Sequence, residues 1–309
     1  MTTGLDRLDA LAADAGLALQ PNVPLAPLTT LRVGGPADRL AAPETVDALV
    51  DLLRAAGEAA VPVFMLGKGS DIVVADAGIR GLVIRTRADA VTIDGTRLRA
   101  EAGASMTALA KQCARAGLAG FDWAISIPGS LGGAIWANAG AHGGEMAQLL
   151  RAVEVYDPRD RERRTLAAGE CAFAYRDSRF KHSPEVVLGG TIELKTGDPA
   201  AITALVDGHQ AHRRRTQPLA DQNAGSVFRN PPGDFAGRLI EAAGLKGHRL
   251  GTAQVSTLHA NFIVTDRGGA RAADVRALGD EVRARVATAF GIELSYEIAF
   301  VGDWTEEAG

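Results

Sequence analysis

Two glycine-rich segments of the chain could bind phosphate. Residues 66–71 (LGKGSD) and 127–134 (IPGSLGGA) each follow an apolar run. Glycine permits the left-handed turns that direct successive amide N–H groups at an anion, and it lets the backbone approach a phosphate closely. Neither segment is a Walker loop, because Lys68 is followed by glycine, and neither spells the dinucleotide fingerprint. One such segment would be read as an ordinary strand-to-loop turn, but two together favour a pyrophosphate and a flat ligand.

Three further segments carry residue types that could act on a substrate. Residues 175–181 (YRDSRFK) are rich in charge, a composition that is also typical of a solvated loop. Ser226 could simply cap a turn, and neither a G-x-S-x-G elbow nor a suitably placed histidine marks it as an acyl-transfer nucleophile. Glu297 lies in 292–300 (IELSYEIAF), where strand alternation puts it on the polar face. A half-exposed strand with its polar side in water would look the same.

The histidines and cysteines do not mark a metal site. His209 and His212 are three residues apart on an expected helix, but no further ligand nearby completes a set, so a solvated helix face is the better interpretation. Cys113 and Cys171 have no metal or redox spacing, which is typical of reduced thiols in a cytosol. The basic run 213–215 could contact a phosphate or complement a helix dipole. We therefore expect no metal.

Helical and strand patterns alternate through the first two thirds of the chain, and a self-contained α+β pattern follows. The segment 213–223 separates the two parts, because it is polar, lacks a clear period and contains Pro218. The patterns predict helices at 5–15, 44–56, 105–116, 198–215, 234–243 and 272–290. They predict strands at 61–66, 81–85, 91–93, 97–101, 152–157, 186–194, 252–256, 261–265 and 293–301.

Composition indicates a soluble globular protein. The 309 residues are 47% hydrophobic and 23% charged with a net charge of −4, so nothing favours nucleic acid or anionic lipid as a partner. The longest uncharged stretch, 123–144, contains Pro128 and several glycines, which is unlike a membrane helix. The first residues carry acids where a signal peptide needs a basic end. We expect a cytoplasmic protein, and a monomer, because no coiled coil or marked apolar patch is legible.

Taken together, ten segments in sequence order resemble the UDP-N-acetylenolpyruvoylglucosamine reductase (MurB) family, and the resemblance runs from about Thr29 to Gly302. The segments are TTLRVGGPAD, LGKGSDIVV, GLVI, IPGSLGGAIWANAGAHGGE, YRDSRFK, TQPL, AGSVFRNP, AGRLIEAAGLKG, HANFIV and FGIELSYEIAFVG. The interval between Arg176 and Ser226 is short and lacks the loop that supplies a substrate-contacting tyrosine in the longer family subtype. The chain is therefore similar to the shorter subtype.

The resemblance implies an α+β fold with a vanillyl-alcohol-oxidase-type FAD-binding domain of two subdomains, 1–88 and 89–212. A C-terminal α+β substrate-binding domain would cover 213–309. The cofactor FAD would lie between the two subdomains, with its pyrophosphate against the glycine-rich segments.

The resemblance also implies which residues form the site. The catalytic residues would be Arg176, Ser226 and Glu297. Substrate contacts would be made by Tyr175, Arg214, Asn230 and His259. The cofactor would be bound by Gly67, Lys68, Gly69, Ser70, Asp71, Pro128, Gly129, Ser130, Gly132 and Gly133.

Some positions depart from the usual family pattern. The first glycine-rich segment usually has glycine and asparagine where this chain has Lys68 and Asp71. A carboxylate near a pyrophosphate is repulsive unless it binds ribose or backbone instead. Gln222, Leu258 and Thr265 also depart, but none of the departures touches the three catalytic positions.

The implied reaction transfers hydride from NADPH through FAD to UDP-N-acetylglucosamine enolpyruvate, which gives UDP-N-acetylmuramic acid for peptidoglycan synthesis. Hydride addition would place negative charge on the adjacent carbon and its carboxylate. Arg176 could hold that carboxylate through two parallel hydrogen bonds. A protonated Glu297 would donate a hydrogen bond, and Ser226 would deliver the proton to carbon. The alternatives are a flavin oxidase of the same superfamily acting on another substrate and a non-catalytic nucleotide-binding relative.

Overall fold

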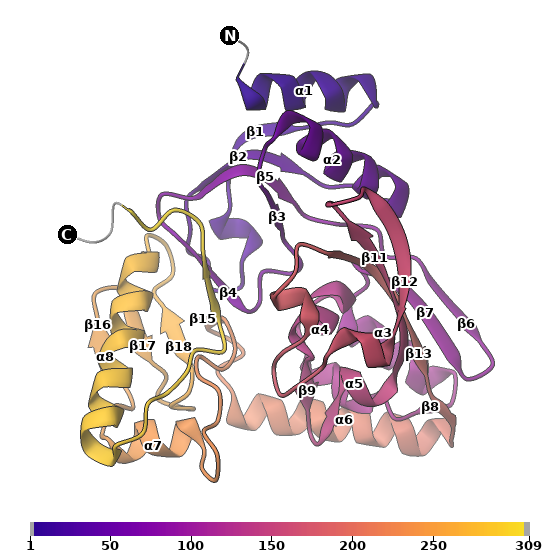
Figure 1. Cartoon of the computed structure of the whole chain (residues 1–309). Coiled ribbons are helices and arrows are strands. Elements are labelled where there is room, and N and C mark those ends of the chain that lie inside the picture. The colour runs from indigo at the N-terminus through magenta and orange to yellow at the C-terminus, as the bar shows by residue number, and fades with distance from the viewer. Residues whose placement is uncertain (1–2, 306–309) are drawn as a thin grey trace. The chain divides into compact units, whose positions relative to one another are not determined.

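The computed structural model describes residues 3–305, which divide into two compact units (Figure 1). The first unit comprises the chain up to Pro21 together with Arg39–Gly67 and Gly81–His212. The second unit comprises Asn22–Asp38, Lys68–Arg80 and the chain from Arg213 onward. Within residues 3–305 no helix combines the length and the apolar character needed to cross a membrane.

The N-terminal part of the first unit is built on two capped helices. Helix α1 (Gly4–Asp14) begins after Thr3, and α2 (Val46–Ala59) begins after Thr45. Each threonine accepts a hydrogen bond from a backbone N–H of the first turn, which satisfies a donor that the helix itself leaves unpaired. Apolar side chains of both helices pack with those of β5 (Ile79–Ile84) in one buried cluster.

A five-stranded antiparallel sheet with strand order β12-β11-β13-β7-β6 forms the rest of the first unit. These strands are Glu162–Ala167, Leu150–Asp157, Val186–Glu193, Arg97–Glu101 and Val91–Asp94. Strands β6 and β7 confirm the strands predicted at 91–93 and 97–101 and pair as a hairpin, in which Gly95 takes a positive φ. Helices α3 (Met106–Arg115) and α4 (Leu131–Ala137) pack on the sheet through the largest buried cluster of the described residues.

Several elements run from one unit into the other along the chain. In a four-stranded sheet with strand order β1-β2-β5-β3, the strands β1 (Gln20–Pro24), β2 (Pro36–Ala41) and β5 (Ile79–Ile84) do so, whereas β3 (Val63–Met65) belongs to the first unit. Helix α6 (Pro199–Thr216) also crosses the division. Its predicted start is confirmed, because the Asp198 carboxylate accepts from the Ala200 amide at 3.1 Å.

Shorter elements connect these parts of the chain. They are η1 (Ala26–Leu28), β8 (Leu118–Ala119), η2 (Asp122–Ser126), β9 (Gly140–Ala141), β10 (Gly144–Glu145), α5 (Met146–Leu149), η3 (Ala168–Cys171), η4 (Arg179–Lys181) and β14 (Lys195–Thr196).

The second unit packs helices on a small antiparallel sheet with strand order β15-β18-β17-β16. These strands are Gln222–Asn223, Ile263–Thr265, Ala253–Val255 and Arg249–Leu250. Helix α8 (Ala272–Phe290) buries Val275, Leu278, Val282 and Val286 on one face, and it ends at Gly291 in a left-handed conformation. The unit also contains α7 (Ala236–Ala242), and β4 (Ile72–Val74) pairs in parallel with β19 (Ala299–Val301).

The strand predicted at 293–301 is only partly correct. The burial alternates as predicted, with Leu294 and Ile298 buried and Glu293 and Ser295 exposed. However, regular pairing is confined to β19, and residues before it make a single β-bridge at Tyr296. The alternation of apolar and polar residues correctly predicted which side chains face inward. The length of the strand depends instead on its pairing partner β4, which lies far away in the sequence.

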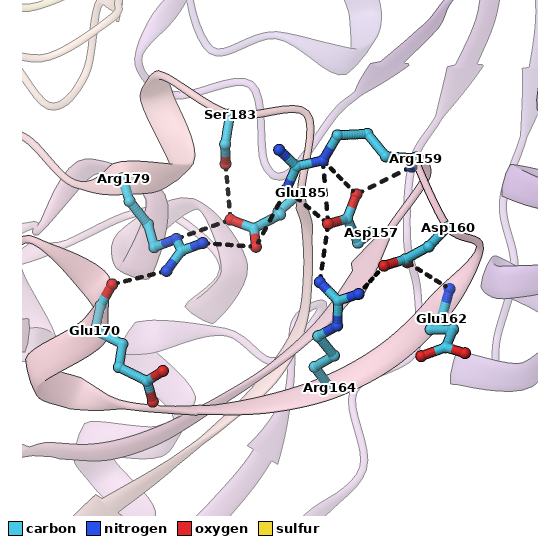
Figure 2. Close-up of polar contacts among 9 residues, drawn as sticks. All are labelled: Asp157, Arg159, Asp160, Glu162, Arg164, Glu170, Arg179, Ser183 and Glu185. Atoms are coloured by element: carbon cyan, nitrogen blue, oxygen red, sulfur yellow. Dashed lines mark hydrogen bonds and ion pairs between the residues drawn. The ribbon is translucent and has the colours of Figure 1, made fainter.

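Buried carboxylates hold the edge of the five-stranded sheet to the loop before β13 (Figure 2). Asp157 is 1% exposed and accepts from the Arg159 amide at 3.0 Å, from Arg159 Nε at 2.9 Å and from Arg164 Nη1 at 3.1 Å. Glu185 is 5% exposed and is held by both Arg179 Nε and Nη2 at 2.9 Å. Hydrogen bonds from Arg159 hold the pKa of Asp157 far below its usual range, and Arg164 adds to this effect.

Replacing Asp157 with asparagine is expected to lower the free energy of unfolding at pH 7 by about 1–3 kcal/mol. The carboxylate binds its proton more weakly when folded, so its stabilisation is present above the unfolded pKa of about 4 and is lost as pH falls below it. The difference in Tm between wild type and Asp157→Asn should therefore be constant from pH 8 to pH 5 and shrink below pH 4. Asp160→Asn, at an exposed partner of Arg164, is the matched control, and an equal loss there would contradict the assignment.

Candidate active site

In the first unit, the two glycine-rich segments meet. Ser130 is the N-cap of α4, and a Cβ added to Gly67 would lie 2.6 Å from the Ser130 hydroxyl. A larger residue at position 67 would therefore displace the Ser130 hydroxyl. The Gly132 amide donates to the Ala102 carbonyl at 2.9 Å, and a Cβ on Gly132 would lie 2.9 Å from that of Ala102. Gly132 thus serves close packing, and its N–H is already paired.

In the second unit, residues 68–71 continue the first glycine-rich segment. Lys68 is exposed. Gly69 is buried at φ +63°, and its carbonyl accepts from the Thr30 amide at 2.9 Å. The Asp71 carbonyl accepts from the Ala299 amide at 3.0 Å, so the segment is fixed against the end of the chain that carries Glu297.

Tyr175 and Arg176 occupy a tight turn in the first unit. Reciprocal backbone hydrogen bonds of 3.0 Å between Ala174 and Asp177 close this turn. Arg176 has φ +55°, and its guanidinium Nη2 donates to the Gly140 carbonyl at 2.8 Å. The Tyr175 side chain is 51% exposed, and the Arg176 guanidinium lies 5.2 Å from the centre of its ring.

Ser226 and Glu297 belong to neighbouring segments of the second unit. The Glu297 amide donates to the Val227 carbonyl at 2.8 Å, and the Phe228 and Tyr296 rings stack with centroids 5.0 Å apart. These contacts place the serine next to the segment of the glutamate, although 70 positions separate them in the sequence. Both side chains are half-buried.

Asn261 fixes the Ser226 segment, and the sequence patterns did not single it out. It is 4% exposed, and its side chain accepts from the Phe228 amide at 2.9 Å and donates to the Phe228 carbonyl at 2.7 Å. Its backbone carbonyl accepts from the Val227 amide at 2.9 Å. The sequence did contain a signal, since Asn261 lies inside the apolar run HANFIV. A side-chain amide that is buried in such a run has to form hydrogen bonds with other groups.

The four expected substrate contacts lie on different elements. Tyr175 is in the turn of the first unit, whereas Arg214 is exposed near the end of α6. Asn230 accepts from the Ala236 amide at 3.1 Å and so lies at the start of α7.

His259 lies beside α7 as well, since a Cβ on Gly237 would be 3.2 Å from its ring. Burial lowers the pKa of His259, and the positive charge of Lys246 lowers it further. The ring Nδ1 accepts from the Asn261 amide at 3.2 Å, which fits a neutral imidazole.

The structure therefore gathers the expected residues in two groups, one within each unit. The first unit contains Gly67, Tyr175, Arg176 and residues 128–133, of which Gly67 and Ser130 lie side by side. The second unit contains residues 68–71, Ser226, Glu297, Asn230, His259 and Arg214. Across residues 3–305 no three side chains of the metal-binding types are arranged to hold an ion.

His209 is half-buried, its Nε2 lies 3.0 Å from an Asp122 carboxylate oxygen, and its ring stacks on that of His142. The prediction that His209 lies on a solvated helix face is therefore wrong.

Comparison with known proteins identifies the family. The model described as "UDP-N-acetylenolpyruvoylglucosamine reductase, C-terminal domain" matches residues 217–301, and one described as "FAD binding domain" matches residues 37–165. UDP-N-acetylenolpyruvoylglucosamine reductase 2 of Symbiobacterium thermophilum is 45% identical over 98% of both chains. The chain belongs to the UDP-N-acetylenolpyruvoylglucosamine reductase family.

Other members of the family agree. The reductase of Heliobacterium modesticaldum is 48% identical over 91% of this chain and 90% of its own. The crystal structure of the reductase from Thermus caldophilus is 37% identical with a TM-score of 0.77, and it covers 92% of this chain and 99% of its own. The predicted α+β fold with an FAD-binding domain is confirmed, as is the family resemblance.

The residues present fit FAD. Gly67 leaves room at the Ser130 hydroxyl that any larger residue would fill, and Gly69 is required by its positive φ and by the Leu28 carbonyl 2.5 Å from where its Cβ would be. A side chain at either position would displace Ser130 or the Leu28–Thr29 backbone, so glycine preserves the two turns that are proposed to face the cofactor.

Proposed function

We propose that this chain catalyses the NADPH-dependent, FAD-mediated reduction of UDP-N-acetylglucosamine enolpyruvate to UDP-N-acetylmuramic acid in peptidoglycan precursor synthesis. The observation that carries the proposal is the 45% identity to a named reductase over 98% of both chains. Arg176, Ser226 and Glu297 are all present, which supports a catalytic protein over a decayed relative.

FAD, when bound, supplies the means of moving hydride from NADPH to the substrate double bond. The residues proposed to hold it are those of the two glycine-rich segments, with Gly67 and Gly69 giving backbone access and Lys68 giving a positive charge. Asp71 is proposed to face ribose or backbone, because a carboxylate beside the pyrophosphate would be repelled.

Arg176 is proposed to bind the substrate carboxylate. Its guanidinium carries a permanent charge and a planar fork that matches two carboxylate oxygens. As hydride arrives at the terminal carbon, negative charge develops on the adjacent carbon and the carboxylate, so a positive group fixed there stabilises the transition state more than the ground state.

Glu297 is proposed to donate a hydrogen bond, and Ser226 is proposed to donate a proton. The Glu297 carboxyl donates a hydrogen bond to the developing charge. The Ser226 hydroxyl delivers its proton to the carbon next to the carboxylate. Because a hydroxyl is a weak acid, this transfer has to coincide with the development of carbanion character.

Further details are proposed on the same basis. Tyr175, Arg214, Asn230 and His259 contact the substrate. Residues 1–88 and 89–212 form the two subdomains of the FAD-binding domain, and residues 213–309 form the substrate-binding domain. The protein acts as a cytoplasmic monomer.

An absorbance spectrum of the purified protein tests the proposal. The preparation should be yellow, should bleach anaerobically when NADPH is added and should regain colour when UDP-N-acetylglucosamine enolpyruvate follows. A preparation that stays colourless in excess FAD would reject the proposed reductase activity. A preparation that regains colour only with oxygen and releases hydrogen peroxide would indicate a flavin oxidase instead.

A further inference from the structure

Arg176 adopts a backbone conformation that a side chain disfavours. Its φ of +55° lies in the left-handed region, where Cβ approaches the following carbonyl. It is the second central residue of the turn closed by Ala174 and Asp177, a position that usually prefers glycine. Neighbouring groups therefore have to hold this residue in place.

Lys181 contacts the main chain of Arg176 directly. Its Nζ donates to the Arg176 carbonyl at 2.9 Å, and the same ammonium lies 4.4 Å from the centre of the Trp136 ring. Lys181 is half-buried and ends η4. The Ser178 hydroxyl at the N-cap of η4 donates to the Trp136 carbonyl at 2.7 Å, so η4 is also hydrogen-bonded to α4 at the residue that precedes it.

Residues 138–140, which follow α4, fix the other parts of the turn that contains Arg176. Asn138, which is 0% exposed, donates from Nδ2 to the Ala174 carbonyl at 2.8 Å and accepts from the Ala147 amide at 3.0 Å. Two residues further on, the Gly140 carbonyl accepts from the Arg176 guanidinium. Lys181 thus fixes the carbonyl of Arg176, and residues 138–140 fix the turn and the guanidinium.

We propose that Lys181 is a positioning residue, whose ammonium holds the Arg176 main chain in the left-handed conformation and so sets the direction of the guanidinium. The inference rests on the proposed function, since it assigns the guanidinium to the substrate carboxylate. Without the ammonium, the Arg176 peptide can leave the left-handed region, and the guanidinium spends less time aligned.

The test compares Lys181→Met, which keeps an apolar stem over Trp136, with Lys181→Arg, which restores a positive donor. Lys111→Met, at an exposed lysine of α3, is the matched control. In Lys181→Met, kcat with the enolpyruvyl substrate should fall roughly 10- to 100-fold, because small misplacements of a positioned group have effects of that size. The rate of FAD reduction by NADPH alone and the Tm should stay near wild type, and Lys181→Arg should recover much of the loss.

Crystal structures of the wild type and of Lys181→Met give a readout that needs no activity. The wild type should keep Arg176 at positive φ with the guanidinium on Gly140, and the variant should lose both. Unchanged Arg176 geometry in the variant, or equal losses in both half-reactions with a lowered Tm, would overturn the inference. A wild type that shows this geometry but does not reduce the substrate would reject the proposed function instead.

Discussion

Ser226→Ala is expected to retain FAD and to be reduced by NADPH at a normal rate, yet to transfer hydride to the enolpyruvyl substrate at least about 10²–10³ times more slowly. The reason is that NADPH oxidation needs no proton at the substrate carbon, whereas reduction of the substrate is completed only when that carbon is protonated. Stopped-flow absorbance measures the two half-reactions separately. It should show normal bleaching and a slow return of the yellow colour.

The geometry of the second unit provides a matched control for this variant. Ser295 is exposed on the segment that pairs with residues 227–229, and its carbonyl accepts from the Arg229 amide at 2.9 Å. Ser295→Ala removes the same hydroxyl from the neighbouring segment without touching that backbone bond, so it should leave both half-reactions intact. Equal impairment of both half-reactions in Ser226→Ala, or impairment of neither, would remove Ser226 from the proposed role.

Local sequence signals were sufficient wherever the structure depends on neighbours in the chain. Asp198 followed by Pro199 predicts the start of α6, because capping acts within one turn of helix. The hairpin of β6 and β7 follows from the residues of its turn for the same reason. In each case the stabilising group lies within four positions of the residue that it stabilises.

The same signals were insufficient where partners lie far apart in the sequence. Nothing near Glu297 indicates that its amide pairs with Val227, and nothing near Asp157 indicates that its loop carries a buried carboxylate network. Asn138 and Asn261 are buried amides that tie segments 36 and 33 positions apart. A sequence shows that a polar residue lies in an apolar run, but its partner is known only from the fold.

The family motifs indicated the candidate site residues but not how these residues are arranged. The segment YRDSRFK was compatible with a solvated loop, and its composition alone favoured that reading. The structure shows instead a closed turn with Arg176 at positive φ and Lys181 against its carbonyl. Backbone strain of this kind is invisible in composition, since arginine is not a residue that left-handed turns prefer.

Arg176→Lys is expected to lower turnover by about 10² or more while leaving the affinity for FAD within about twofold. Lysine keeps the charge but has no planar fork, so it cannot form two parallel bonds to the substrate carboxylate or reach both it and the Gly140 carbonyl. Steady-state kinetics with varied substrate, together with FAD titration by fluorescence, measure the two effects. The loss should appear in kcat as well as in kcat/KM, because the carboxylate gains charge only on the way to the transition state.

A control substitution at a second arginine distinguishes two effects of Arg176→Lys, which are the loss of the planar guanidinium and a change in the left-handed backbone. Arg161, in the turn between β11 and β12, is exposed and also left-handed at φ +64°. Arg161→Lys therefore makes the same substitution in the same backbone conformation, at a residue with no assigned role in the chemistry, and it should leave turnover unchanged. If Arg176→Lys turned over normally, or if both variants lost activity together with Tm, the guanidinium of Arg176 would have no part in binding the carboxylate, and the developing charge would have to be stabilised by Glu297 and Ser226 alone.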